Sequence, residues 1–419
     1  MLTHRLTRRG FVQGAAAAAV AAPYVITSAA LGNAEKPPAS ERVALGHIGV
    51  GNQGGTLFHC FQNCHGVQSV AVADAYKDRR EAYARACGGK PYADFRDLLA
   101  RNDIDGVVIA TPDHWHVAIA NAAARAKKDA YVEKPLGLTL AQDLACRKVF
   151  QENQRVFQYG TMQRSSDHCR LGCELVRSGR IGKVHAIEVV APNGGAGGST
   201  REAPIPSTLD YDTWLGPAPR SPFTNSRCNP PGTYWIYDYS IGYLAGWGAH
   251  PLDIMVWGSD ADLAGPIVFE GTGDIPTKGL YNTVYNWDVK VRMADGVEMT
   301  FKAGGDLTKF IGPDGWVAVS RYGIDAQPKS LLKSVLGPKD VHLLKSENHY
   351  QNYVDAIKSR GPTVSPLADA VRSDIISQIS DIAVRTKRKI TWDPKREVIV
   401  GDDEAAKMLT RPMRPPWTI

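Results

Sequence analysis

The sequence predicts an α/β protein, in which an N-terminal Rossmann domain with a doubly wound parallel sheet precedes a second α/β domain built on a largely antiparallel open sheet. Three observations predict this class. A glycine-rich motif at 49–54 joins an apolar segment to a helix, apolar and helical segments then alternate, and the pattern changes near residue 154. The chain has 419 residues, 43% of them apolar, which is enough for two or three buried cores.

The first 34 residues are expected to be a twin-arginine signal peptide and not part of the fold. Thr7-Arg8-Arg9-Gly10-Phe11-Val12 is a twin-arginine pattern, and an alanine-rich run up to residue 25 follows it. The apolar run is too short to span a bilayer, so we expect periplasmic or otherwise exported protein without stable membrane insertion. The alternative is an uncleaved cytosolic N-terminus.

The charge of the chain argues against a nucleic-acid partner. The formal net charge is +6, and it falls by three if Arg5, Arg8 and Arg9 are removed with the signal. A nearly balanced chain of this size does not have the strong positive field that nucleic acid requires. The expected partner is therefore a small molecule.

The cysteine content predicts neither a disulfide framework nor a metal site. Seven is an odd number, in a chain too long to need cysteine cross-links for stability. Cys60 with Cys64, and Cys169 with Cys173, have the spacing of neighbours on one helix face, so a metal site is conceivable. No metal is expected, because nothing else completes a ligand set and buried cysteines are mostly small apolar residues.

The glycine motif predicts a dinucleotide site. A buried strand at 43–49 leads into Gly49-Val50-Gly51-Asn52-Gln53-Gly54, and a helix is expected at 55–64. Glycines allow the tight turn and let the backbone approach a pyrophosphate, which lies at the N-terminus of the helix. The cofactor expected here is a nicotinamide dinucleotide.

The residue after the second strand favours NAD over NADP. That strand, at 67–73, ends on Asp74, whose carboxylate would accept hydrogen bonds from the ribose hydroxyl groups and repel a 2′-phosphate. Lys77, Arg79 and Arg80 follow and could bind a 2′-phosphate instead. NAD is the prediction, and NADP is the alternative.

The alternation continues to about residue 155. We expect helices at 95–102 and 117–126, and strands at 106–110 and 129–132. Since ligands bind outside the carboxyl ends of parallel strands, the loops at 49–54, 111–116 and 133–135 should meet at one edge of the sheet.

From about residue 154, segments with alternating or β-branched residues predict the second sheet. Gly- and Pro-rich loops join these segments, and 193–231 is expected to be an ordered loop region near the site. Helices are expected at 348–360 and 366–387. The domains expected are the signal at 1–34, the NAD-binding domain at 41–155, and a substrate and oligomerisation domain at 156–419. The strands expected in this last domain include 156–160, 184–190, 267–271, 288–293, 297–302 and 315–320.

Three motifs resemble one enzyme family. They are Glu133-Lys134-Pro135 after the fourth strand, the A-T-P-D-H-W-H run at 110–116, and L-D-Y-D-T-W-L-G-P at 209–217. The sequence is similar to the glucose–fructose oxidoreductase / inositol dehydrogenase / MocA family from about residue 43 to its end. The resemblance implies a substrate among sugars, cyclitols and related polyols, and a homo-oligomer, a dimer or tetramer, joined through the second sheet.

The resemblance also implies catalytic roles for Lys134 and His250. A cation beside the reacting carbon stabilises the developing alkoxide, which suits Lys134. A histidine with a pKa near 6.5 can take the hydroxyl proton at neutral pH, which suits His250. The family usually has Asp four residues before this histidine, where the present chain has Gly246. Asp238 or Asp253 could orient His250 instead.

The remaining candidates come from an aromatic stretch and from a loop after the strand at 156–160. Sugar rings stack on aromatic side chains, and the stretch at 234–239 offers several. Gln163 and Arg164 match the family position that borders nicotinamide and substrate, although Arg164 could equally form a structural salt bridge. Substrate contacts are expected from Arg164, Tyr234, Tyr237, Asp238, Tyr239 and Asp253. Cofactor contacts are expected from Gly49, Gly51, Asn52, Gln53, Asp74, Thr111, Asp113, Trp115, His116, Glu133, Lys134 and Gln163.

The function predicted is an exported NAD-dependent oxidoreductase that acts on a sugar, glycoside or polyol hydroxyl group and regenerates its cofactor internally. One alternative is a redox-neutral enzyme that cleaves or epimerises glycosides after transient oxidation. The related α-N-acetylgalactosaminidases work in this way, but the resemblance implies that they lack the lysine of E-K-P, so Lys134 argues against them. Another alternative is a non-catalytic sugar- or nucleotide-binding protein, favoured only by Gly246.

Overall fold

The computed structural model describes residues 37–259 and 263–419. The chain divides into two compact units, residues 1–42 and 43–419. The described part of the first unit holds a 3-10 helix at Ala39–Glu41. The predicted export signal lies outside the described residues. Everything below concerns residues 43–419.

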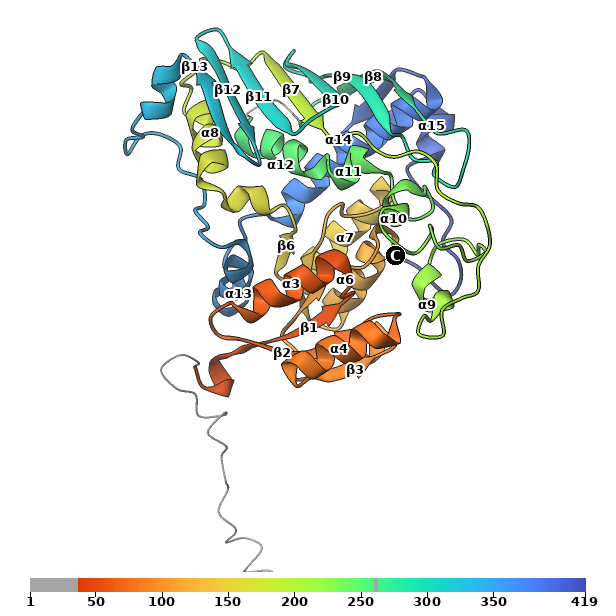
Figure 1. Ribbon diagram of the computed structural model, residues 1–419. Coiled ribbons are helices and arrows are strands. Elements are labelled where there is room, and N and C mark those ends of the chain that lie inside the picture. Colours follow the sequence, from red (N-terminus) through yellow and green to blue (C-terminus); the bar gives the residue numbers. More distant parts are fainter. Residues whose placement is uncertain (1–36, 260–262) are drawn as a thin grey trace, which may run out of the picture. The chain divides into compact units, whose positions relative to one another are not determined.

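Six parallel strands form the N-terminal sheet, in the order β3-β2-β1-β4-β5-β6 (Figure 1). The predicted parallel Rossmann sheet is therefore confirmed. The order reverses between β1 and β4, and such a switch point is where α/β proteins bind ligands. The strands are β1 (Val43–Ile48), β2 (Val67–Ala73), β3 (Lys90–Tyr92), β4 (Gly106–Ile109), β5 (Asp129–Val132) and β6 (Phe157–Tyr159).

Apolar side chains on both faces of this sheet are buried by helices. On β4, Val107 and Ile109 join one core while Val108 joins the other, because successive side chains of a strand point to opposite faces. A short continuous apolar run in the sequence therefore indicates a strand covered on both sides. The covering helices are α3 (Asn52–Gln62) and α13 (His349–Ser359) in one core, and α5 (Phe95–Leu99), α6 (His116–Arg125) and α7 (Leu140–Asn153) in the other.

The strand register brings the predicted loops to one edge. The last residues of five strands pair in a row, so the residues that follow them leave the sheet together. These last residues are Ala73, Ile48, Ile109, Val132 and Tyr159.

Two of the differences from expectation have a steric or a compositional reason. Helix α3 begins at Asn52, three residues before the predicted start, and includes Gly54 and Gly55. A Cβ on Gly54 would clash with the carbonyl oxygen of Gly49, so these glycines serve close packing inside the helix. Helix α4 (Lys77–Cys87) was not expected, because Ala84 is its one buried residue and no apolar stripe marks it.

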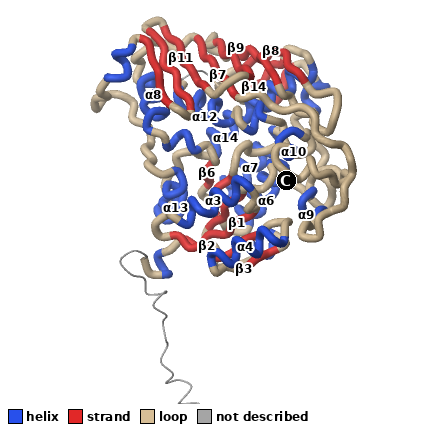
Figure 2. Tube along the Cα trace, viewed as in Figure 1, coloured by secondary structure: helices blue, strands red, loops and turns tan. Residues whose placement is uncertain are grey.

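Nine strands form the second sheet, in the order β13-β12-β11-β7-β10-β9-β8-β14-β15. Among the strands that the structure describes in this sheet, only β7 and β10 pair in parallel, so the predicted, largely antiparallel sheet is confirmed. One face packs on helices α8 (Asp167–Arg177), α12 (Ala249–Gly258) and α14 (Leu367–Thr386) (Figures 1 and 2). The strands are β7 (Ala186–Ala191), β8 (Ile267–Asp274), β9 (Asn286–Arg292), β10 (Glu298–Ala303), β11 (Leu307–Gly312), β12 (Gly315–Ser320), β13 (Gly323–Gln327), β14 (Ile390–Asp393) and β15 (Val398–Val400).

Two elements join the halves of this unit. Strand β6 is the sixth strand of the parallel sheet, although the predicted boundary at residue 155 places it in the second domain. In helix α14, Val371 packs in the core of the parallel sheet, while Ile376 and Ile379 pack in the core of the second sheet. The two sheets are thus attached to one buried helix.

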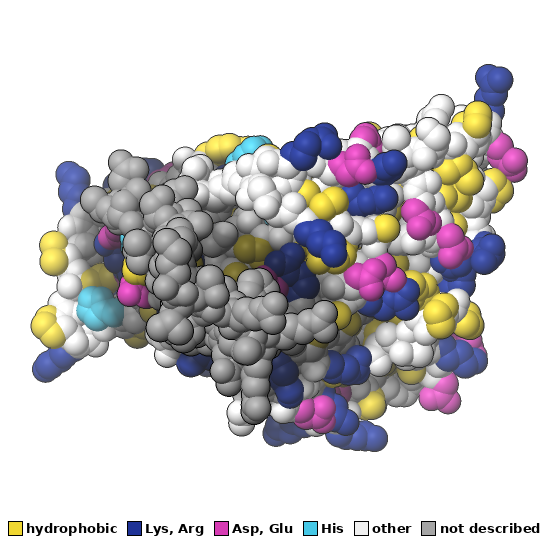
Figure 3. Space-filling view, turned by 90° about the horizontal axis from the view of Figure 1, so that it is seen from below, with side chains coloured by type: hydrophobic (Ala, Val, Ile, Leu, Met, Phe, Trp, Pro, Cys, Tyr) yellow, Lys and Arg dark blue, Asp and Glu magenta, His cyan; other side chains and the backbone are white. Residues whose placement is uncertain are grey.

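Surface charge, helix apolarity and the state of the cysteines relate to the expectations about nucleic acid, membrane, disulfides and metal. On the face seen in Figure 3, lysine and arginine side chains are interspersed with aspartate and glutamate. In the described part of the chain no helix combines the length and apolarity needed to cross a bilayer. All seven cysteines are free, and within residues 37–259 and 263–419 no cluster of histidine, cysteine and carboxylate side chains could hold a metal ion.

Candidate active site

A first cavity of about 230 Å³ lies over the glycine loop, at the carboxyl edge of the parallel sheet. Gly49 has φ of +81°, and a Cβ there would come within 2.7 Å of the Thr111 backbone nitrogen. Gly51 precedes α3 and no side chain caps the helix, so its first N–H groups remain for a ligand such as a pyrophosphate. All the expected cofactor residues except Gln163 line this cavity: Gly49, Gly51, Asn52, Gln53, Asp74, Thr111, Asp113, Trp115, His116, Glu133 and Lys134.

Asp74 is held by the backbone at one end of the cavity. Its carboxylate oxygens accept hydrogen bonds from the N–H groups of Val50 and Tyr76, each at 2.8 Å. Burial raises the pKa of Asp74, and the two N–H groups oppose that shift. Arg79 stacks on the ring of Tyr76 at 3.8 Å and lines the same cavity. The Asp74 carboxylate, which favours the ribose hydroxyl groups of NAD, and the Arg79 cation, which favours the 2′-phosphate of NADP, therefore line the same cavity.

His116, at the start of α6, connects the loop after β4 to the loop after β5. His116 Nδ1 lies 2.7 Å from the carbonyl oxygen of Pro135, and its Nε2 lies 2.9 Å from that of Thr111. Thr111 Oγ1 and Asp113 Oδ2 are buried without a partner among the described residues. Unsatisfied polar atoms in a cavity wall are typical of a site that binds a polar ligand. These atoms and the uncapped helix fit a nucleotide.

Glu133 and Lys134 connect the glycine loop to the second domain. Gln53 Nε2 donates to Glu133 Oε1 at 3.1 Å, which ties the start of α3 to the end of β5. Lys134 Nζ donates to the carbonyl oxygen of Gly246 at 2.9 Å. Gly246 ends the short helix α11 (Tyr243–Gly246), so the lysine reaches across from one sheet's edge to the other half of the unit.

A second cavity of about 170 Å³ adjoins the first at Lys134. His250 lines it, and so do three half-buried aromatic side chains, Tyr234, Tyr243 and Trp247. Neighbouring rings of this arc have centroids 6.1 and 5.8 Å apart. The residues that line both cavities are Asn52, Gln53, Asp113, Lys134 and Tyr234.

His250 differs electrostatically from the expectation. Burial, followed by the charges of Lys134 and Arg321, lowers the pKa of His250 well below 6.5. Its Nδ1 is buried and has no hydrogen-bond partner in the described part of the chain. The proposal that Asp253 orients this ring is wrong, because that carboxylate binds another residue. Asp238 does not line the cavity either.

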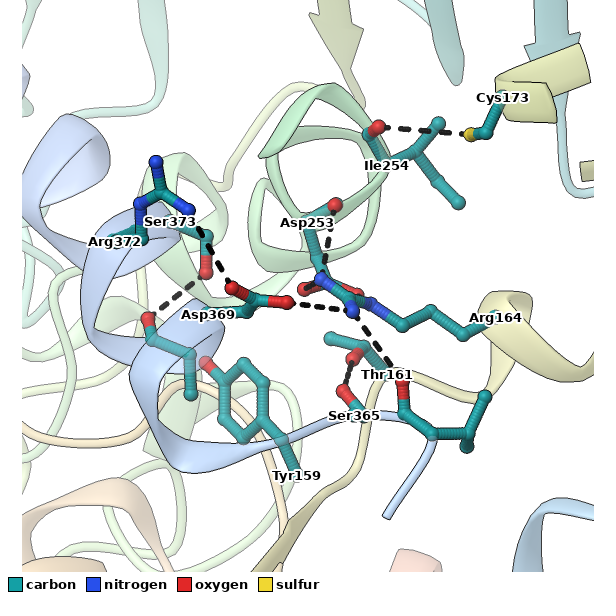
Figure 4. A network of polar contacts seen from close by, with 12 residues as sticks. Tyr159, Thr161, Arg164, Cys173, Asp253, Ile254, Ser365, Asp369, Arg372 and Ser373 are labelled. Carbon is teal, nitrogen blue, oxygen red and sulfur yellow. Dashed lines mark hydrogen bonds and ion pairs between the residues drawn. The ribbon is translucent and has the colours of Figure 1, made fainter. Parts of the chain in front are cut away.

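Arg164 forms a buried ion-pair network with two helices (Figure 4). Its guanidinium donates to both carboxylate oxygens of Asp253 on α12, at 2.7 and 2.6 Å, and to Asp369 on α14 at 2.8 Å. Arg164 is 2% exposed and Asp253 is 1% exposed. Neither lines the two cavities, so the structure does not support their expected contact with substrate. Of the two roles considered for Arg164, the structure supports the salt bridge.

Four more candidates, Tyr237, Asp238, Tyr239 and Gln163, lie outside the two cavities. The Tyr237 ring lies between the guanidinium groups of Arg385 and Arg411, at 3.5 and 3.6 Å. Tyr239 is fully buried, and its hydroxyl group accepts a hydrogen bond from Arg227 at 2.9 Å. The partners of Tyr237 and Tyr239 hold both rings away from the two cavities, and Asp238 lines neither cavity, so the structure does not support the expected substrate contacts of these three residues. The amide Nε2 of Gln163 is buried and unpartnered in the described structure, but Gln163 lines neither cavity either.

Sequence reasoning missed Tyr243, Trp247 and Arg321. Tyr243 and Trp247 lie seven and three residues before His250, and all three line the second cavity. Arg321 follows β12, and only the folded sheet brings it to the cavity. No local pattern marks that arginine.

Two family models match the chain. An "oxidoreductase family, NAD-binding Rossmann fold" model matches residues 43–161, and an "oxidoreductase family, C-terminal alpha/beta domain" model of the same family matches residues 195–419. Together they cover both halves of the described unit.

Curated relatives share part of the chain. A glycosyl hydrolase family 109 protein of Shewanella baltica and an alpha-N-acetylgalactosaminidase of Shewanella oneidensis are each 30% identical over 210 residues. The matches cover 43% of this chain and 45% of each relative, so this chain spans less than half the length of the relatives it matches.

Solved structures share the fold at lower identity. The WlbA dehydrogenase of Chromobacterium violaceum, solved with NADH and UDP-GlcNAcA, has a TM-score of 0.64 at 14% identity, covering 84% of this chain and 96% of that one. The apo scyllo-inositol dehydrogenase of Lactobacillus casei has a TM-score of 0.59 at 16% identity, covering 84% and 98%. The aldose-aldose oxidoreductase of Caulobacter crescentus has a TM-score of 0.59 at 17% identity, covering 83% and 99%.

Proposed function

The chain belongs to the glucose–fructose oxidoreductase / inositol dehydrogenase / MocA family of oxidoreductases, and from this premise we propose that it oxidises a hydroxyl group of a sugar, glycoside or polyol with tightly bound NAD. One observation carries the proposal. The cavity over the glycine loop shares Lys134 with an adjoining second cavity, which is lined by a histidine and three aromatic side chains. When bound, the nicotinamide supplies the hydride acceptor.

Lys134 and His250 have separate roles in removing the proton from the reacting hydroxyl group. Lys134 is a cation at the junction of the cavities, where it would stabilise the oxygen of the reacting hydroxyl group as its proton leaves. His250 is neutral at physiological pH, since its pKa is lowered, and so it can accept that proton. The aromatic arc would hold the apolar face of the sugar ring.

Turnover with a panel of sugars and polyols tests these roles. Lys134→Ala and His250→Ala should each lower turnover by about 10²–10⁴-fold, the range typical of general acid–base groups. Their effects should be strongly non-additive in the double variant, because both groups serve one step. Lys148→Ala is the matched control, since that lysine is exposed on α7. Near-native turnover in His250→Ala would remove this histidine from the mechanism.

The location and assembly are part of the same proposal. The twin-arginine pattern supports export of a protein folded with its cofactor. The periplasm has no free NAD pool, so the enzyme would regenerate bound NAD by reducing a second substrate. The face of the second sheet opposite its helices is available for a homo-oligomer, since alternate residues of β9 are exposed there.

A redox-neutral glycosidase is the second candidate, and the names of the curated relatives favour it. The argument from Lys134 against that branch is weakened by the 30% identity to an alpha-N-acetylgalactosaminidase. Aryl glycosides distinguish the two functions. Release of the aryl group without accumulation of reduced nicotinamide supports the glycosidase, and accumulation of reduced nicotinamide with free sugars supports net oxidation.

A further inference from the structure

Arg321 lies at the wall of the second cavity and forms no ion pair with any carboxylate of residues 37–259 and 263–419. It follows β12, and its guanidinium lies 4.6 Å from the centre of the Trp247 ring. Its Nε is buried and, in the described part of the chain, has no hydrogen-bond partner. Asp306 accepts a hydrogen bond from the backbone N–H of Arg321, not from its guanidinium.

The other charges of this cavity do not compensate Arg321. Lys134 is a second cation there, and its ammonium group is bonded to the carbonyl oxygen of Gly246. Asp113 is the only carboxylate among the described lining residues. It is buried, its pKa is raised by burial, and it interacts with Ser240 and His116. A half-buried guanidinium of this kind is normally paired, because desolvation of a charge is costly.

We propose that Arg321 is an oxyanion subsite, so that the substrate is a sugar bearing a carboxylate or phosphate group. The inference rests on the proposed function, because it assigns the substrate class of the same cavity. The cation–π contact with Trp247 restrains the guanidinium, and the planar fork of an arginine matches an oxyanion bidentately. Tyr234, Tyr243 and Trp247 then hold the ring of the same sugar.

Calorimetric titration of the holoprotein tests the charge requirement apart from turnover. The probes are D-glucuronate and D-galacturonate for the carboxylate, glucose 6-phosphate for the phosphate, and glucose and galactose as neutral counterparts. We expect at least one anionic sugar to bind more tightly than its neutral counterpart. In Arg321→Gln that sugar should bind about 10- to 100-fold more weakly, as loss of a charge-assisted pair predicts. The neutral sugars should be unaffected.

Two further variants control for structure. Arg321→Lys keeps the charge and should recover part of the affinity. Lys309→Met removes another cation stacked on a tryptophan of the same sheet, at 4.7 Å from Trp316, and should leave sugar binding unchanged. Melting temperatures of all variants confirm folding.

The outcomes separate the two proposals. Anionic sugars that bind through Arg321 without changing the nicotinamide absorbance support the subsite and contradict the oxidoreductase. Reduction of the nicotinamide by neutral sugars, with no preference for anionic ones, supports the oxidoreductase and overturns the subsite. The subsite is also overturned if no anionic sugar binds, or if Arg321→Gln retains the preference.

Discussion

His250 shows how burial changes the pKa expected for a side chain while its proposed role stays the same. As an isolated histidine it would titrate near neutral pH, but burial and two nearby cations keep it uncharged. Lys134 was predictable from the sequence, because E-K-P follows a strand whose direction fixes the edge at which it ends. The position of Arg321 was not predictable, because only the folded sheet brings it to the cavity. The roles of the tyrosines were not predictable either, because contacts distant in sequence decide which of these rings are buried.

Gly246→Asp should move the acid limb of the pH–rate profile to higher pH. A carboxylate beside His250 favours the imidazolium and raises its pKa, so the neutral base is lost at a higher pH. The substitution fits sterically, since a Cβ on Gly246 would meet only Tyr243 Cδ1, at 3.9 Å. Maximal turnover need not rise. Gly246→Asn is the uncharged control, and an acid limb that is the same in both variants would argue against this account of His250.

Arg164→Met should destabilise the protein by about 3–5 kcal/mol, the usual cost of removing one partner of a buried ion pair. Asp253 would be left buried without its partner, and α12 would lose its tie to the loop before α8. Urea unfolding measures the change. Lys148→Met is the exposed control. A variant of native stability with a raised KM would instead place Arg164 at the substrate.

At the scale of elements, a buried carboxylate holds the loop that contains Lys134. Asp374 on α14 accepts hydrogen bonds from the Leu136 N–H and the Tyr159 hydroxyl group, both at 2.8 Å. Asp143 is a second buried carboxyl group nearby, bonded to Gln378 at 2.6 Å. This clamp joins β6, α7 and α14 behind the site. Its residues show no pattern in the sequence, because they come from three elements that meet only in the fold.

Asp374→Asn should flatten the pH dependence of stability between about pH 4 and 7. Burial raises the pKa of Asp374 to about 7. The folded state therefore binds a proton that the unfolded state releases near pH 4, so native stability falls as pH rises through this window. Asn removes the titration and retains one acceptor. Melting temperatures across pH measure this, with Asp143→Asn compared in parallel. An unchanged slope in Asp374→Asn would contradict the assignment.

Asp74→Ala should weaken NAD binding about 10- to 100-fold through loss of hydrogen bonds to a charged group, and should relax discrimination against NADP. Calorimetry on nucleotide-depleted protein measures both affinities. Asp74→Asn retains an acceptor for Val50 or Tyr76, so it separates the charge from the support of the loop. Unchanged affinity for both nucleotides in Asp74→Ala would show that this residue is not at the ribose.

At the scale of the whole molecule, the two sheets were predictable and their attachment was not. Buried apolar runs predicted the parallel strands, and alternation predicted β9, whose Trp287, Val289 and Val291 face the core. Helix α14 contributes residues to both cores, and strand β6 belongs to the parallel sheet, so a boundary drawn from composition at residue 155 removes β6 from the sheet that it completes. The second cavity arises from this attachment, because its residues come from both halves.

The central claim is that a nicotinamide nucleotide held in the first cavity exchanges hydride with a sugar in the second. Mass spectrometry of the nucleotide tests this directly when the protein is quenched during its first turnover of sugars deuterated at their carbinol carbons. The deuteride stays on the nucleotide only until it passes to a product, so early quenching detects it in net oxidation and in redox-neutral chemistry alike. We expect purified protein to contain NAD(H), and the nucleotide to gain one deuterium in the native enzyme but not in Lys134→Ala. Absence of any nucleotide, or a nucleotide that stays unlabelled with every sugar, would contradict the claim.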